Sequence, residues 1–404
     1  MRFYLYILFL FMTCSFCCMA ADSNPFDDIE ISSSTVKSNF SKKGSVDFLK
    51  KEILTQFSAG ENEGSDKPYF RQSFGFEYLK RFSNDVSTVS SFNMQGRLVY
   101  RKNFIQTPSD MEGQNREDLF FEYHNAYLDL FNALDSFQNE NSRKKNLGRF
   151  NARIGRFYLP FGLNLQTDTH ATLMQLSNDQ NFGFERDWYG GFWGKVSPSF
   201  NYDLYYMLGS GYEPISHDQR GLIGSRVSLS NRYLFENGIE GGLSILSGER
   251  ISKHAVMRSP GVSMRAKKDV VETLRYGADF RLTKSVINGT VTYTTELSTG
   301  KDEEDDIFTQ LYQLDYLKNS RRWGCSLQYR RFEQDINLMT GVMMPENMNY
   351  GKADSSLIAE YSRYFRYSPG NDNLHWVKFN VEKHLERVMD KKNTIFSIQY
   401  YRYW

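Results

Sequence analysis

The stretch "LRYGADFRL", residues 274–282, decides the fold class because its apolar and polar side chains alternate with a period of two. One face carries Leu274, Tyr276, Ala278, Phe280 and Leu282, and the other carries Arg275, Gly277, Asp279 and Arg281. This alternation predicts a β-strand that lies between an apolar and a polar environment. Residues 287–294, 323–330 and 377–381 alternate in the same way, so the pattern belongs to much of the chain.

Two classes of all-β protein have this composition. Aromatic residues make up 16% of the chain, yet the mean hydropathy is −0.56. A secreted β-sandwich or propeller fits these values, and so does a membrane β-barrel, because its lumen-facing residues keep the average hydropathy low. The formal net charge of +1 gives no reason to expect a nucleic-acid partner.

The connections between the predicted strands favour the membrane barrel. Bulky Tyr and Trp residues gather near segment ends, where the two interfaces of a bilayer would lie. Short connections alternate with long ones, as tight periplasmic turns and larger outside loops require. The long connections are predicted at 58–68, 102–118, 159–183, 249–272 and 336–352. We count about sixteen strands, centred near residues 52, 75, 95, 125, 153, 191, 205, 226, 243, 279, 291, 313, 327, 360, 380 and 400. Residues 133–146 are either a long periplasmic connection or a sign that this count slips.

The N-terminus predicts export. Residues 1–21 have an arginine, an apolar stretch and small residues before Ala20 and Ala21, which is typical of a Sec signal peptide. Residues 22–45 are expected to be a flexible periplasmic lead-in, and residues 46–404 the barrel. No later apolar run is long enough for a membrane helix. Signal cleavage would leave Cys325 as the sole cysteine, which allows neither an internal disulfide nor a cysteine zinc site.

The C-terminal stretch "TIFSIQYYRYW", residues 394–404, alternates to its last residue. It resembles the C-terminal assembly signal of outer-membrane proteins, with Tyr400 and Trp404 as the residues of that signal. Arg402 departs from this pattern, since an aromatic residue is usual there, and an arginine can direct its charge toward the headgroups.

A second resemblance lies in "ARIGRFYLPFGLNLQTDTHATLMQLSN", residues 152–178. Gly155, Arg156 and Phe157 precede Pro160-Phe161-Gly162, and the whole resembles the Gram-negative outer-membrane porins, the broad group of phosphate-selective and other sixteen-strand porins. The resemblance implies a transmembrane antiparallel β-barrel whose third extracellular loop, 159–183, folds inward and narrows the pore. The residues of this constriction loop would be Asp168, His170 and Asp179. It also implies a homotrimer in the outer membrane of a Gram-negative bacterium, in contact with lipid and lipopolysaccharide.

Such a barrel would pass small hydrophilic solutes or ions by diffusion, and the charges that line it would set its selectivity. If the apolar face meets lipid, the basic lining residues are Arg71, Arg97, Arg149, Arg153, Lys195, Arg226, Arg275, Arg281, Arg330 and Lys378. The acidic lining residues are fewer: Glu77, Asp129, Asp203, Glu240, Asp279, Asp315 and Glu382. This imbalance predicts a mild anion preference. Strict alternation places Arg156 on the lipid side, and a bulge near Gly155 would turn it inward.

Catalysis is not expected. The six histidines are scattered with no H-E-x-x-H spacing, and no cofactor or metal site is predicted. The acidic residues 301–306 are expected to form a loop that could bind divalent cations, and the basic loop 249–272 could attract anions or contact lipopolysaccharide phosphates. Two alternatives to a porin stay open: a barrel that sheathes or anchors a partner such as a cytochrome, and a secreted β-protein that binds carbohydrate.

Overall fold

A computed structural model describes residues 44–60, 68–83, 88–102, 118–133, 148–163, 173–174, 177–197, 199–211, 214, 216, 218–230, 237–251, 270–335, 353–368, 373–386 and 394–404. The predicted signal peptide and nearly all of the predicted lead-in lie outside these residues. Within them, no helix combines the length and the apolar character needed to cross a bilayer.

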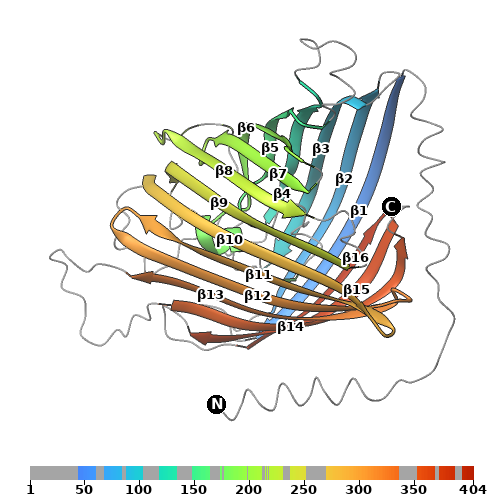
Figure 1. The fold of residues 1–404 in the computed structure, drawn as a ribbon. Coiled ribbons are helices and arrows are strands. Elements are labelled where there is room, and N and C mark those ends of the chain that lie inside the picture. Colours follow the sequence, from blue (N-terminus) through green and yellow to red (C-terminus); the bar gives the residue numbers. More distant parts are fainter. Residues whose placement is uncertain are drawn as a thin grey trace. The chain divides into compact units, whose positions relative to one another are not determined.

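The described residues form sixteen strands in one closed barrel, in which each strand is antiparallel to its neighbours (Figure 1). The strands are β1 Gly44–Gly60, β2 Tyr69–Ser83, β3 Thr88–Lys102, β4 Asp118–Leu130, β5 Asn151–Tyr158, β6 Arg186–Lys195, β7 Phe200–Met207, β8 Gly221–Ser230, β9 Asn237–Ile251, β10 Val270–Val286, β11 Gly289–Asp302, β12 Asp305–Lys318, β13 Trp323–Asp335, β14 Ala353–Ser368, β15 Asn373–Glu386 and β16 Thr394–Tyr403. One short helix, α4 Ser177–Phe182, lies between β5 and β6. The predicted all-β class and strand number are therefore confirmed, and each predicted centre falls inside one strand.

The last strand closes the barrel by pairing with the first. The amide of Trp404 donates to the carbonyl of Lys51 at 3.0 Å, and the amide of Lys51 donates to the carbonyl of Trp404 at 2.8 Å. The guanidinium carbon of Arg402 lies 4.9 Å from the centre of the Trp404 ring, which is cation–π geometry. An aromatic end of the chain is thus ordered because it completes the sheet.

The two faces of the strands differ as the alternation predicted. On β10, Tyr276, Phe280 and Leu282 are exposed on the outer surface, whereas Arg275 and Asp279 are buried on the inner one. Near the 319–322 turn, the outward rings of Tyr316, Trp323 and Tyr361 form a contiguous row, with centroids 5.3 and 6.3 Å apart. An apolar outer band with aromatic residues at strand ends is the surface that a bilayer requires.

Two connections clarify the predicted layout. Strands β4 and β5 pair directly with each other, so the strand count does not slip between them. The prediction of a loop at 301–306 was wrong. Strand β11 extends to Asp302 and β12 starts at Asp305, which leaves Glu303 and Glu304 as a two-residue turn. Glu303 has a φ of 54°, the left-handed conformation that a tight hairpin turn demands.

Candidate functional site

The inner wall carries buried arginines that reach across an entire strand to a carboxylate. Arg97 on β3 donates to Glu52 on β1 through Nε and through Nη2, the latter at 3.0 Å from Oε2. Between them lies Gly75 of β2, which is in register with both residues. A Cβ atom at Gly75 would lie 2.7 Å from Cγ of Arg97 and would overlap the Glu52 carboxylate. The glycine therefore permits the contact, and we call this arrangement a clasp.

Two more clasps follow the same plan. Arg226 on β8 donates to Asp279 on β10 at 2.7 and 3.2 Å, over Gly242 of β9. Arg330 on β13 donates to Glu382 on β15 at 2.8 Å, over Ser356 of β14. The hydroxyl of Ser356 accepts a further bond from Arg330 Nε at 2.6 Å. Each clasp joins three consecutive strands and places a neutral pair on the inner wall.

Most of the predicted basic lining residues have an acidic partner. The remaining pairs, with their shortest N–O distances, are Arg153–Asp129 at 2.6 Å, Lys378–Glu360 at 3.0 Å, Arg275–Asp302 at 2.9 Å, Arg281–Glu240 at 3.5 Å and Arg71–Glu122 at 3.4 Å. The side chains of Arg149, just before β5, and Lys195, at the end of β6, are exposed. A count of basic against acidic residues thus overstates the charge that a passing ion would meet.

Arg156 points inward, and strict alternation was wrong for this residue. Gly155 has a φ of 129°, which only glycine adopts easily, and it shifts the side chains that follow it. The opposite strand β4 has a bulge at His124, since Gln95 pairs with Asn125 and Gly96 with Tyr123. Nη1 of Arg156 donates to the carbonyls of Tyr123 and His124 at 2.5 and 2.6 Å. Arg156 thereby satisfies backbone groups that the bulge removes from the ladder.

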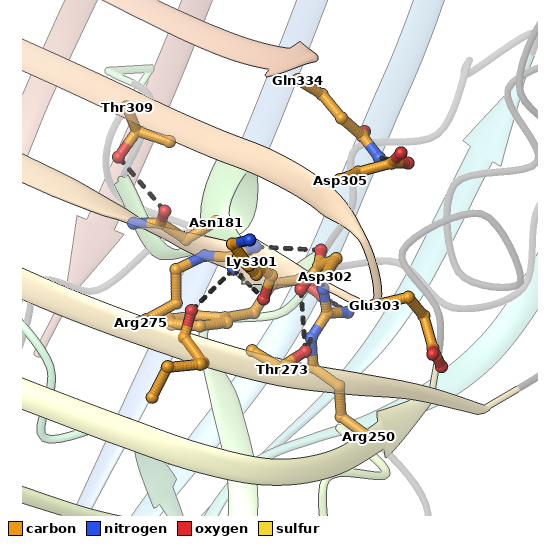
Figure 2. Close-up of polar contacts among 12 residues, drawn as sticks. Asn181, Arg250, Thr273, Arg275, Lys301, Asp302, Glu303, Asp305, Thr309 and Gln334 are labelled. Atoms are coloured by element: carbon orange, nitrogen blue, oxygen red, sulfur yellow. Dashed lines mark hydrogen bonds and ion pairs between the residues drawn. The ribbon is translucent and has the colours of Figure 1, made fainter. Parts of the chain in front are cut away.

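The described part of the segment between β5 and β6 packs against inward-facing residues of β9 to β12. The amide of Gly162 donates to the hydroxyl of Ser244 on β9 at 3.2 Å. Oδ1 of Asn181 on α4 accepts from Ser298 at 2.7 Å. It also accepts from Thr309 at 3.1 Å (Figure 2). The Phe161 ring lies over Gly277, where a Cβ atom would come within 2.7 Å of it. These contacts hold the described part of the segment, which we call the inner segment, on the inside of the barrel.

The residues predicted for the constriction loop are only partly described. Asp168 and His170 lie outside the described residues. Asp179 belongs to α4, but its side chain is not among those described.

An apolar cluster fixes the inner segment in place, and sequence reasoning missed it. Four residues of the segment pack with five inward-facing residues of β6 to β9: Leu159, Phe161, Phe182 and Phe184 with Tyr189, Tyr205, Met207, Leu222 and Leu246. The available signal was the loss of alternation at the end of β7. There, inward Tyr205 and Met207 neighbour outward Leu204 and Tyr206, so both faces are apolar.

The sequence predicted Arg250 only as part of the basic loop. It lies among the last residues of β9, where it holds the C-terminal end of α4. Its Nη1 donates to the carbonyl of Phe182 at 3.0 Å. Its Nε donates to Thr273 at 2.9 Å and its Nη2 to Asp302 at 2.7 Å (Figure 2). Asp302 also pairs with Arg275 at 2.9 Å. The guanidinium is fully buried. This arrangement links the inner segment to three strands of the wall.

Comparison with known proteins places the fold in a class. The chain has the fold of the outer-membrane porins. It is similar to the high-pH structure of OprB from Pseudomonas putida, with a TM-score of 0.59 and 10% identity over 92% of this chain and 97% of that one. It is also similar to an anion-selective porin from Comamonas acidovorans, with a TM-score of 0.53 and 12% identity over 89% of this chain and 100% of that one. No family model matches the sequence, and no curated protein matches it.

Proposed function

We propose that the barrel forms a water-filled channel in the outer membrane of a Gram-negative bacterium, through which small hydrophilic solutes and ions diffuse passively. The observation that carries this proposal is a closed sixteen-stranded barrel with an apolar outer surface and a polar inner wall. Barrels of about this strand number leave an aqueous interior. The apolar outer band argues against the alternative of a secreted, soluble carbohydrate-binding protein. The proposal needs no catalytic group.

Weak ion selectivity follows from the paired wall. Because seven of the nine lining residues Arg97, Arg149, Arg153, Lys195, Arg226, Arg275, Arg281, Arg330 and Lys378 have a carboxylate partner, we propose at most a mild anion preference. The inner segment supports a constriction, so that solute size matters more than solute charge. We expect the barrel to assemble as a homotrimer, which cross-linking in the membrane would test.

Recording from single channels tests the proposal. Protein purified from the outer membrane is inserted into a planar bilayer, and heat-modifiable gel mobility first establishes that the barrel is folded. We expect stepwise ohmic conductance, with a reversal potential in a KCl gradient that lies near zero or slightly toward the chloride side. A folded barrel that inserts without conductance steps would contradict the channel and favour a sheath around a partner.

A further inference from the structure

Beside the apolar cluster, the buried guanidinium of Arg250 provides a charged attachment of the inner segment to the wall. Three further attachments among the described residues are neutral hydrogen bonds: the hydroxyls of Ser298 and Thr309 donate to Asn181, and the hydroxyl of Ser244 accepts from the amide of Gly162. Hydrogen bonds that involve a charged group are roughly twice as strong as neutral ones. Arg250 also donates to α4 and to two neighbouring strands at once. Figure 2 shows its bonds to Thr273 and Asp302 on those strands.

The acceptor on the inner segment suits an arginine. Phe182 is the last residue of α4, and the last carbonyls of a helix have no partner inside the helix. A cation at this end is favourable because these carbonyls carry partial negative charge. The guanidinium carbon of Arg250 also lies 5.9 Å from the centre of the Phe182 ring, so the same residue is held through its backbone and its side chain.

The orientation of the Arg250 guanidinium is fixed by its partners on β10 and β11. Oδ2 of Asp302 accepts from Arg250, and Oδ1 accepts from the hydroxyl of Thr273 at 2.8 Å. Arg275 pairs with the same carboxylate and donates to the carbonyl of Lys301 at 2.7 Å. Asp302 therefore cannot turn away from Arg250 without also losing its contacts with Thr273 and Arg275 on β10, and so it keeps the Arg250 guanidinium directed at α4.

We propose that Arg250 is a positioning residue of the pore: it fixes the inner segment against β9 to β11, with Asp302 as its orienting partner, and so keeps the width of the channel constant. This inference rests on the proposed channel function. Loss of the Arg250 guanidinium would leave the barrel closed, because the pairing of the strands does not depend on this side chain. It would, however, let the inner segment move.

The test measures the inner segment directly. In protein with Cys325→Ser, purified from the membrane, Met174→Cys places a thiol in the inner segment at a position that is 8% exposed. We expect Arg250→Gln to raise the rate at which a maleimide labels this thiol by about tenfold or more, the effect of losing a charged hydrogen bond. The matched control is Arg220→Gln, which removes an exposed arginine that pairs with Glu249 at 2.7 Å. The control should leave the labelling rate unchanged.

A second measurement links the segment to the pore. Arg250→Gln should increase the noise of the open channel, and a disulfide formed by Asn181→Cys with Ser298→Cys should return the noise to the parent level, since these side chains are in contact. Reduction of that disulfide should bring back the increased noise of the Arg250→Gln channel. If Arg250→Gln does not fold, Arg250→Lys carries the same expectation, because it keeps the charge and loses the fork.

The outcomes separate the two proposals. Labelling and noise that stay at the parent level in folded Arg250 variants overturn the positioning role. Faster labelling in a barrel that never conducts supports the positioning role and contradicts the channel.

Discussion

Asp279→Asn should shift the channel toward anions, because it frees the charge of Arg226. Both side chains of this clasp are nearly fully buried, and their two hydrogen bonds measure 2.7 and 3.2 Å. The variant keeps the size of the side chain and removes one negative charge. Arg226→Gln should do the opposite, and the double variant should return close to the parent because it removes both charges.

The size of the shift follows from Coulomb's law. For an ion that passes about 8 Å from the freed guanidinium in water, the interaction is about 0.5 kcal/mol. A Debye length of about 8 Å at 0.15 M salt reduces this to about 0.2 kcal/mol. Because anions gain what cations lose, the anion-to-cation permeability ratio should rise about twofold at 0.15 M and about fivefold at low salt.

Reversal potentials in KCl gradients at two ionic strengths measure this ratio. Breaking a buried pair costs about 3–5 kcal/mol, so folding of each variant is checked by heat-modifiable mobility before recording. The reasoning is refuted if folded Asp279→Asn and Arg226→Gln shift the potential in the same direction, or if neither shifts it at low salt.

Three further predictions test which strand face points outward, whether a clasp needs its glycine, and whether Trp404 contributes to closing the barrel. Phe280→Asp should lower the yield of assembled barrel because it puts a charge on the outer surface, whereas Arg281→Asp should fold and shift reversal potentials toward cations; equal tolerance of both would contradict the face assignment. Gly75→Ala should displace Arg97 and lower stability by about 1–3 kcal/mol, measured as an earlier loss of the heat-modifiable band, and an unchanged transition would mean that the clasp needs no glycine. Deletion of Trp404 removes two backbone hydrogen bonds to β1 and should slow assembly in pulse-chase fractionation, and an unchanged rate would argue against a role in closure.

The sequence predicted the parts of the fold that depend only on the two-residue alternation of apolar and polar side chains. Residues 274–282 show why: each of their side chains meets either the outer surface or the inner wall, so alternation reports directly on position. The count of sixteen strands followed from the same signal. The tight turn at Glu303 was missed because charged residues were interpreted as a loop, although the adjoining strands need only two residues to reverse direction.

The candidate site was less predictable because it depends on contacts between distant strands. Arg250 looked like one basic residue among several in a loop, and its role appears only when Phe182 and Asp302 are placed beside it. Arg156 was ambiguous because its direction depends on a bulge in another strand, which period-two reasoning cannot locate. The partners of Arg226 and Arg97 were equally hidden, since each carboxylate lies two strands away.

The clasps explain why small residues occupy inward positions on this wall. Neighbouring strands lie about 4.8 Å apart, so an arginine must span nearly 10 Å to reach a carboxylate two strands away. Only a long side chain above a glycine or serine can do so. A glycine inside a strand weakens the sheet, and the ion pair that it permits offsets this cost by joining three strands. Because the same pairs neutralise the wall, a channel of the proposed kind would discriminate between solutes mainly by the space between the wall and the inner segment, which is the space that the proposed role of Arg250 keeps constant.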